Sequence, residues 1–378
     1  MKKILTVKTV FYSLLIFIPI TVVLEYYLHP GESVIFLCSA LAIVPLVGLL
    51  AKATEGLADH LGPGIGGLLS ATFGNAPELM IGIIALREGL FDVVKASITG
   101  AIIANILLVF GTGAILGGLR YPVLRFNSSA ACIGTTMLAL SAIGLLLPAI
   151  YHHLVPSVTP VVELNLGLAI AIVLLATYIL NLIFSLKTHR HLYAGIPALA
   201  EEELESGKRP EIAAAKQGEA DQKKRGMWRS LGMLAVSAGL IAWMSEMLVT
   251  SVEGTARQMG MSQVFIGVVF VAIIGNAAEQ STSIIMALKN KMDLAINITT
   301  GASIQIALFV APVLLILSYF IAPAPMDLTF TIMEVVSVMI AVGVIRLTAH
   351  DGDMNWIEGV QLVAVYIMLA IMFYLMPA

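Results

Sequence analysis

The chain has 378 residues, of which 59% are hydrophobic and only 12% are charged, and its mean hydropathy is +0.96. This composition excludes an ordinary water-soluble domain and indicates an integral membrane protein surrounded by a lipid bilayer. The formal net charge of −3, with no basic patch outside the loops, gives no support to nucleic-acid binding.

Apolar runs recur along the whole chain, and a membrane-spanning helix needs about 20 apolar residues. The first run has no small-residue cleavage site after it, so we expect a retained helix rather than a signal peptide. The predicted spans are 9–28, 33–54, 63–87, 93–119, 128–149, 163–186, 230–252, 261–288, 294–322, 328–348 and 355–376. The sequence therefore predicts an all-α membrane protein with eleven transmembrane helices.

Lys and Arg residues collect on one side of the membrane if these eleven helices alternate in direction. That side receives 18 of the 21, and the other side receives only Arg87, Lys95 and Arg257. The positive-inside rule then puts the N-terminus in the cytoplasm and the C-terminus outside. The short N-terminal segment favours a prokaryotic plasma membrane, with a vacuolar membrane as the alternative.

The stretch GNAPELMIGIIAL, which begins at Gly74, returns 201 residues later as GNAAEQSTSIIMA. The alignment runs without a gap, and 13 positions across residues 74–111 are identical to their counterparts. A second pair, TEGLADHLG at 54–62 and VEGTARQMG at 252–260, aligns at nearly the same offset. The chain is therefore an internal duplication.

Equivalent positions are five predicted helices apart, an odd number, so the two copies cross the membrane in opposite directions. Inverted repeats of this kind are typical of secondary transporters, whose substrate site lies at the midplane between the halves. We predict a leading helix in 1–32, a first five-helix repeat in 33–186, a cytoplasmic linker in 187–229 and a second five-helix repeat in 230–378.

Glu78 and Glu279 occupy equivalent places inside apolar runs, each after a Gly-Asn pair. A carboxylate at the bilayer centre costs about 2.5 kcal/mol or more, so a duplicated pair needs a compensating role. A helix that breaks at Gly-Asn frees carbonyl oxygens, which membranes tolerate where the backbone lines a cavity. Carboxylates and carbonyls together favour a hard cation such as Ca²⁺, whose two charges match the two acids.

The same two acids account for coupling to protons. Two facing carboxylates without a cation repel each other and lose solvation, which raises their affinity for protons. One Ca²⁺ or up to two protons can then neutralise the pair. A carrier that reorients only when its buried charge is neutralised exchanges one for the other.

At these motifs the chain resembles the calcium/proton exchanger branch of the calcium/cation antiporter superfamily. The phrases SIQIALFVAP at 303–312 and FSLKTHRHLY at 184–193 extend the resemblance, which covers residues 33–376. It implies an ion site on the third and eighth helices, in which Glu78 and Glu279 alternately hold Ca²⁺ and H⁺. Ca²⁺ and H⁺ are then transported substrates, and no cofactor is expected.

The resemblance also implies neutral ligands or supports for the cation, namely Asn75, Asn276 and Gln305, with Asn105 as a further candidate. Gln280 stands where the family usually carries histidine, and Ala302 where serine is common.

Glu55 and Glu253 belong to the second repeated motif and are predicted at helix ends on opposite faces of the membrane. They are candidates for the access path or gates that guide cations toward the site. Ordinary interfacial glutamates have the same appearance, so both interpretations stay open.

The favoured function is secondary antiport of Ca²⁺ against H⁺ by alternating access. The sequence has no HExxH, no GxSxG and no phosphate loop, so we do not expect an enzyme or an ATP-driven pump. The alternatives are a sodium-coupled cation/Ca²⁺ exchanger and, from another class, a cation channel. Whether the chain forms a homo-oligomer and whether the 187–229 linker has a regulatory role are left open.

Overall fold

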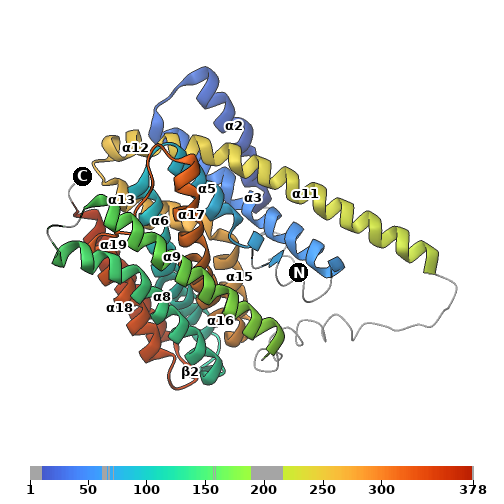
Figure 1. Cartoon of the computed structure of the whole chain (residues 1–378). Helices are drawn as coiled ribbons and strands as arrows, with labels where there is room; N and C mark the ends of the chain where they lie inside the picture. The colour runs from blue at the N-terminus through green and yellow to red at the C-terminus, as the bar shows by residue number, and fades with distance from the viewer. Residues whose placement is uncertain are drawn as a thin grey trace.

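The structure of the chain, a computed structural model, is built almost entirely of helices (Figure 1). The residues that the structure describes are 11–61, 66, 69–70, 72–155, 157, 159–188 and 216–376. Most of the predicted linker, residues 189–215, lies outside the described residues.

The first half of the chain contains the helices that carry the first copy of the repeated motif. Its elements are η1 (Leu14–Ile16), α2 (Phe17–Val23), η2 (Leu24–Leu28), α3 (Glu32–Leu61), α5 (Ala76–Arg87), α6 (Phe91–Ile103), η3 (Ala104–Val109), α7 (Phe110–Gly118), β1 (Leu124–Arg125), α8 (Ser128–Leu154), α9 (Pro160–Ile183) and η4 (Phe184–Thr188).

The second half contains the helices of the second copy. Its elements are α11 (Lys216–Thr250), α12 (Val252–Met259), α13 (Gln263–Phe265), η6 (Ile266–Val271), α14 (Ala272–Gly275), α15 (Ala277–Leu288), α16 (Met292–Gln305), η7 (Ile306–Val310), α17 (Ala311–Ile321), α18 (Ile332–Thr348), β2 (Asp353–Met354) and α19 (Trp356–Tyr374).

Eight helical stretches among the described residues are long and apolar enough to cross a membrane. They are Phe11–Leu28, Glu32–Ala58, Phe91–Gly118, Ser128–Leu154, Pro160–Ile183, Gly226–Thr250, Met292–Ile321 and Trp356–Tyr374. Each corresponds to one of the eleven predicted spans, and the protein is an integral membrane protein.

The remaining three predicted spans are interrupted or short. The span predicted at 63–87 is described as a helix only in part, chiefly as α5. The one at 261–288 is divided by a break before α15, and α18 has 17 residues. A ninth span is counted if Val252–Met259 and Gln263–Gly275, which are bent by 114° to each other, form one.

Both Gly-Asn pairs interrupt their helices, as the sequence predicts. Asn75 has φ −99° and ψ 18°, and Asn276 has φ −91° and ψ 13°, so the backbone leaves the helix in the same way in both halves. The next helix starts at once, because the carbonyl of each asparagine accepts a hydrogen bond four residues on, from Leu79 N at 3.1 Å and from Gln280 N at 3.0 Å.

Local sequence explains where several other helices begin. The Asn127 side chain caps α8 by accepting hydrogen bonds from two backbone N–H groups. Thr331 with Glu334 opens α18, and Asn355 with Glu358 opens α19, each pair as a reciprocal capping box.

Contacts among loops and helix ends fall into two groups, one at each end of the bundle. At one end, β1 and β2 pair antiparallel, with Leu124 opposite Met354, and the Asn127 N–H donates to Asp293. At the other end, the Lys95 ammonium bonds Asp327 at 2.6 Å. The ribbon of β1 and β2 is the one departure from the predicted all-α fold within the described residues.

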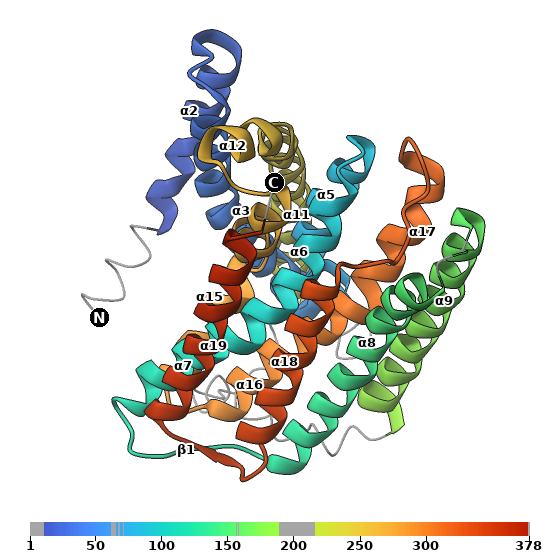
Figure 2. The ribbon, with the colours of Figure 1, turned by 90° about the vertical axis from the view of Figure 1, so that its left-hand side faces the viewer.

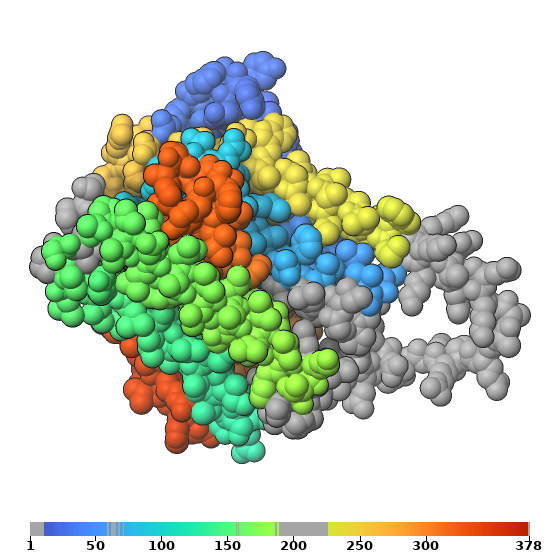
Figure 3. Space-filling view, viewed as in Figure 1, coloured from blue at the N-terminus to red at the C-terminus, as the bar shows by residue number. Residues whose placement is uncertain are grey.

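The two longest helices, α3 and α11, pack along each other, and α5 and α15 lie beside them (Figures 1 and 2). The leading helix sits at the edge of the bundle, where Phe11 covers Gly48 of α3. Helix α9 lies on the surface of the bundle with α17 next to it (Figure 3). The interior that remains surrounds the two Gly-Asn breaks.

Candidate cation site

Glu78 and Glu279 each lie in the first turn of the helix that follows a Gly-Asn break, α5 and α15 respectively. The free N–H groups at a helix N-terminus carry a partial positive charge, which favours a carboxylate there. The duplicated sequence thus builds the same local unit twice, a helix break followed by an acid.

Each carboxyl group reaches the break of the other half. A Cβ atom built on Gly275 would lie 3.2 Å from Glu78 Oε1, and one built on Gly74 would lie 3.9 Å from Glu279 Oε1. A side chain at either glycine would therefore press on the carboxyl group opposite. The two acids, predicted from equivalent sequence positions, come together in one region of the interior.

Three of the four carboxylate oxygens at this place are buried without a hydrogen-bond partner among the described residues. They are both oxygens of Glu78 and Oε2 of Glu279. Buried polar atoms are nearly always hydrogen-bonded in proteins, and exceptions point to a function or to a bound ion or water. These oxygens have the chemistry to hold a hard cation or a proton.

Four amides join the two halves around the acids. Asn75 Nδ2 donates to Gln305 Oε1 at 2.5 Å, and Asn105 Nδ2 donates to Asn276 Oδ1 at 3.2 Å. Asn276 Nδ2 also donates to the Ala272 carbonyl at 3.1 Å. The structure therefore brings all four predicted amides to the two breaks, each bonded across the repeat.

These residues include no group of three or more His, Cys, Asp or Glu placed to hold a metal, and none occurs elsewhere in the described part of the chain. A cation here would be held by two carboxylates and by neutral oxygens.

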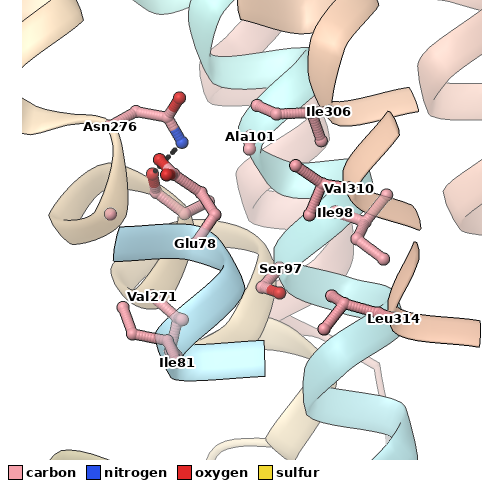
Figure 4. A pocket seen from close by; sticks show the side chains of 12 residues that line it. Glu78, Ile81, Ser97, Ile98, Ala101, Val271, Asn276, Ile306, Val310 and Leu314 are labelled. Carbon is pink, nitrogen blue, oxygen red and sulfur yellow. Dashed lines mark hydrogen bonds between the residues drawn. The ribbon is translucent and has the colours of Figure 1, made fainter. Parts of the chain in front are cut away.

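Glu78 and Asn276 lie side by side in a small pocket (Figure 4). Its volume is about 10 Å³, which is close to the space of one water molecule. Apart from Ser97, the side chains that close the rest of the pocket are apolar and include Ile81, Ile98, Val271, Ile306, Val310 and Leu314. The Glu78 carboxyl is thus sealed from bulk water by apolar packing.

Glu279 lines a much larger space, which we call the acidic cavity. Its volume is about 360 Å³, and its lining includes Glu55 from α3 together with Asn75 and Gln305. The acidic cavity extends from the last turns of α3, around Glu55, to the helix break at Asn75. The two acids therefore have different surroundings, since one faces this cavity and the other is enclosed.

A second large space, which we call the neutral cavity, lies among the first turns of α8, the last turns of α9 and one face of α16. Its volume is about 280 Å³. Its polar lining consists of Tyr178, Asn181, Ser185, Asn297, Thr300 and Gln305. The two cavities share Asn297, Gly301 and Gln305, which succeed one another on α16 at intervals of four residues.

The two predicted access glutamates differ in their surroundings. Glu55 lines the acidic cavity together with Glu279. Glu253 is exposed on α12, where its carboxylate lies 3.8 Å from Arg257 Nη2 and accepts a hydrogen bond from Gln263 at 3.4 Å.

Sequence reasoning did not select Asn297, although it lines both cavities. Its repeat equivalent is Ala96, so the duplication gives no signal for it. It also gave no site role to Lys95, which is 8% exposed and bonds Asp327. For Glu334 it favoured a helix-packing or gating role, and the buried carboxylate of this residue accepts from Thr99 at 3.0 Å. A buried lysine within an apolar run is the signal that could have identified this second polar cluster.

The sequence matches the family described as sodium/calcium exchanger protein over residues 32–187 and 229–375. The chain belongs to this family. The two matched stretches leave out the segment that joins the predicted repeats. The resemblance stated from the Gly-Asn motifs is thereby confirmed at the level of the superfamily.

Comparison with individual relatives in the sodium/calcium exchanger family makes the resemblance more specific. The chain is 41% identical over 373 residues to the Ca²⁺/H⁺ antiporter of Synechocystis, covering 98% of this chain and 99% of that protein. It is 39% identical over 350 residues to the Ca²⁺/H⁺ antiporter ChaA of Bacillus subtilis, covering 92% and 94%. These full-length matches agree with the predicted exchanger branch.

Solved structures give the same fold. The structure of native YfkE matches with a TM-score of 0.79 and 36% identity, covering 97% of this chain and 100% of that one. The crystal structure of the H⁺/Ca²⁺ exchanger CAX matches with a TM-score of 0.70 at 15% identity, covering 97% and 92%, and shows the fold alone.

Proposed function

We propose that this protein is a secondary antiporter that exchanges Ca²⁺ for H⁺ across a membrane by alternating access. The observation that carries the proposal is the pair of buried acids, Glu78 and Glu279, with three carboxylate oxygens that have no partner among the described residues. Relatives named Ca²⁺/H⁺ antiporter, matched over nearly their whole length, support the same function.

In this proposal one Ca²⁺ binds between the two carboxylates, with amide oxygens of Asn75, Asn276, Gln305 and Asn105 as ligands or supports. Two acids neutralise the divalent charge, and the amides supply the neutral oxygens that Ca²⁺ needs. Protons bind the same two carboxylates when the cation leaves. Since the ligands come from both halves, relative movement of the halves opens and closes the site.

The architecture we propose is a leading helix followed by two inverted five-helix repeats, eleven spans in all. The matching conformations of Asn75 and Asn276 and the reciprocal approach of each acid to the other half support it. The N-terminus then lies in the cytoplasm, and the acidic cavity opens on the cytoplasmic side, where Glu55 guides cations toward Glu279.

A direct test is uptake of radiolabelled Ca²⁺ into proteoliposomes, first with an imposed pH gradient and then with an imposed Na⁺ gradient. We expect only the pH gradient to drive uptake. Uptake driven by Na⁺ alone would establish the sodium-coupled alternative, and single-channel currents in planar bilayers would establish the channel.

Glu78→Gln and Glu279→Gln should each reduce proton-driven uptake by at least about tenfold, because an amide can neither release a proton nor neutralise the cation. Glu88→Gln is the matched control, since this exposed glutamate ends the same helix as Glu78 and should leave uptake unchanged. Normal transport by either site variant would contradict the proposal.

Protons and Ca²⁺ should compete for the same carboxylates. Lowering the pH on the side of the acidic cavity protonates more of the acids, so the Ca²⁺ concentration for half-maximal transport should rise there. The measurement is the Ca²⁺ dependence of initial rates at several pH values. A half-saturation that does not change with pH would mean that the two ions use different groups.

A further inference from the structure

The neutral cavity and the acidic cavity approach the cation site from the same end of the bundle. The neutral cavity runs along the last turns of α9 and η4, and the acidic cavity runs along the last turns of α3. They share one face of α16, formed by Asn297, Gly301 and Gln305. No described atom lies within 4 Å of a Cβ built on Gly301, so the space at this junction is open.

The two cavities differ in charge. Glu55 and Glu279 line the acidic cavity. The lining of the neutral cavity among the described residues contains no Asp, Glu, Lys, Arg or His, and its polar groups are hydroxyls and amides. The described linings of the two cavities thus differ in charge, one acidic and one neutral.

Ionic charge decides which ion each route suits. The cost of moving an ion into a low-dielectric space grows with the square of its charge, so a divalent cation needs fixed negative groups along its path. A proton moves by hopping between hydrogen-bonded waters, hydroxyls and amides, and needs only a continuous hydrogen-bonded lining. The acidic cavity suits Ca²⁺, and the neutral cavity suits protons.

Tyr178 contributes a polar group to the wall of the neutral cavity. This side chain is 5% exposed, and its hydroxyl has no hydrogen-bond partner among the described residues. Its ring is fixed by stacking on Phe309 with 5.3 Å between ring centroids. A buried hydroxyl without a partner points to a function. A polar cavity of this size has room for several waters.

We propose that the neutral cavity among α8, α9 and α16 is a proton access path, separate from the acidic cavity through which Ca²⁺ passes. The two paths join at the face of α16 that carries Asn297 and Gln305. A proton can then reach or leave the carboxylates while Ca²⁺ occupies the acidic cavity. This inference rests on the proposed exchange of Ca²⁺ for H⁺.

The test compares two modes of transport in proteoliposomes. Exchange of external radiolabelled Ca²⁺ for internal unlabelled Ca²⁺, without a pH gradient, requires no proton movement, whereas Ca²⁺/H⁺ exchange requires it. Wild-type protein that performs neither mode would overturn the proposed function itself, and this result is distinct from any effect of the variants below.

Gly134→Leu places bulk in the neutral cavity. A Cβ on Gly134 would lie 3.4 Å from Thr300 Oγ1, an ordinary contact, and the rest of the side chain extends into the space beyond. We expect Ca²⁺/H⁺ exchange to fall about tenfold, because a narrowed path loses its chain of waters, while Ca²⁺/Ca²⁺ exchange keeps the wild-type rate.

Two further variants make the comparison specific. Thr282→Leu narrows the acidic cavity and should slow both modes. Gly343→Leu adds the same bulk at a place where no described atom lies within 4 Å of a new Cβ, and it should change neither mode.

Tyr178→Phe keeps the stacked ring and removes only the hydroxyl. It should slow Ca²⁺/H⁺ exchange and leave Ca²⁺/Ca²⁺ exchange unchanged, a split that a purely structural role would not produce. If Gly134→Leu slowed both modes equally, or slowed neither, the neutral cavity would not be a separate proton path.

Discussion

At the scale of single residues, the two halves of the cation site are similar but not identical. Asn75 bonds Gln305, whereas its equivalent Asn276 bonds Asn105. Gln305 is equivalent to Ala104, and Asn105 to Ile306, so the two partners are offset by one position. Both lie where an α-helix changes to the wider π form, a change that often marks functional sites.

The bond between Asn75 and Gln305 should be tested by a double-mutant cycle. Asn75→Ala and Gln305→Ala should each raise the Ca²⁺ concentration for half-maximal transport about tenfold, as expected for groups that orient a metal ligand. Because the two side chains act as a bonded pair, the double variant should raise the Ca²⁺ concentration for half-maximal transport by less than the product of the two single-variant increases. The measurement is the Ca²⁺ dependence of initial rates.

Strictly additive effects would show that the two amides act independently. Thr177→Ala is a control, since its hydroxyl bonds the backbone of its own helix and the change should leave Ca²⁺ half-saturation unaltered.

At the scale of helices, equivalent segments of the two repeats pack differently. A Cβ on Gly100 of α6 would lie 2.2 Å from the Val268 carbonyl oxygen, so α6 and η6 cross in direct backbone contact. At the equivalent Gly301 of α16 the space is open, and the two cavities meet. The sealed pocket of Glu78 and the open cavity of Glu279 follow from this difference.

This difference predicts opposite effects of the same substitution. Gly100→Ala should destabilise the fold by about 1–3 kcal/mol, because the new methyl group collides with backbone that has no room to move. Gly301→Ala should leave stability unchanged or raise it by about 0.5–1 kcal/mol, as expected for alanine in place of glycine within a helix. Thermal unfolding of the purified proteins in detergent measures both.

Equal melting temperatures for the two variants would mean that the crossing of α6 with η6 is not close packed. Transport by Gly301→Ala provides a second readout, since the small methyl group should leave the junction of the cavities passable.

At the scale of the whole molecule, two groups of contacts mark the two ends of the helix bundle. The pairing of β1 with β2 and the bond from Asn127 to Asp293 lie at the end of the bundle that the alternation of eleven spans puts in the cytoplasm. The bond between Lys95, near the start of α6, and Asp327 lies at the end assigned to the outside. Both sets of contacts agree with an odd number of helices between equivalent positions.

The orientation can be tested with cysteine labelling in intact cells. With Cys38 and Cys132 replaced by serine, Glu88→Cys should react with a membrane-impermeant maleimide from outside, and Arg120→Cys should react only after permeabilisation. Both positions are exposed at helix ends. Labelling of Arg120→Cys in intact cells would reverse the orientation.

The sequence by itself determined the membrane class, the duplication, the two helix breaks and the two acids. Each of these depends on composition, period or identity along the chain, which a linear pattern records. It also selected the four amides through resemblance. It did not predict the short β1–β2 ribbon or Asn297, because loop pairing and the exposure of one helix face depend on what packs against them.

Only the tertiary structure decided which acid is sealed and which is open. Glu78 and Glu279 both follow a Gly-Asn-Ala stretch, and the residues after them, Leu-Met-Ile-Gly and Gln-Ser-Thr-Ser, do not by themselves fix how much space surrounds each carboxyl group. The distinction arises because helices from the two repeats pack closely at Gly100 and leave space at Gly301, and close packing is a property of the assembled bundle. The two repeated acids thus occupy unequal environments, as a carrier that opens to one side at a time requires.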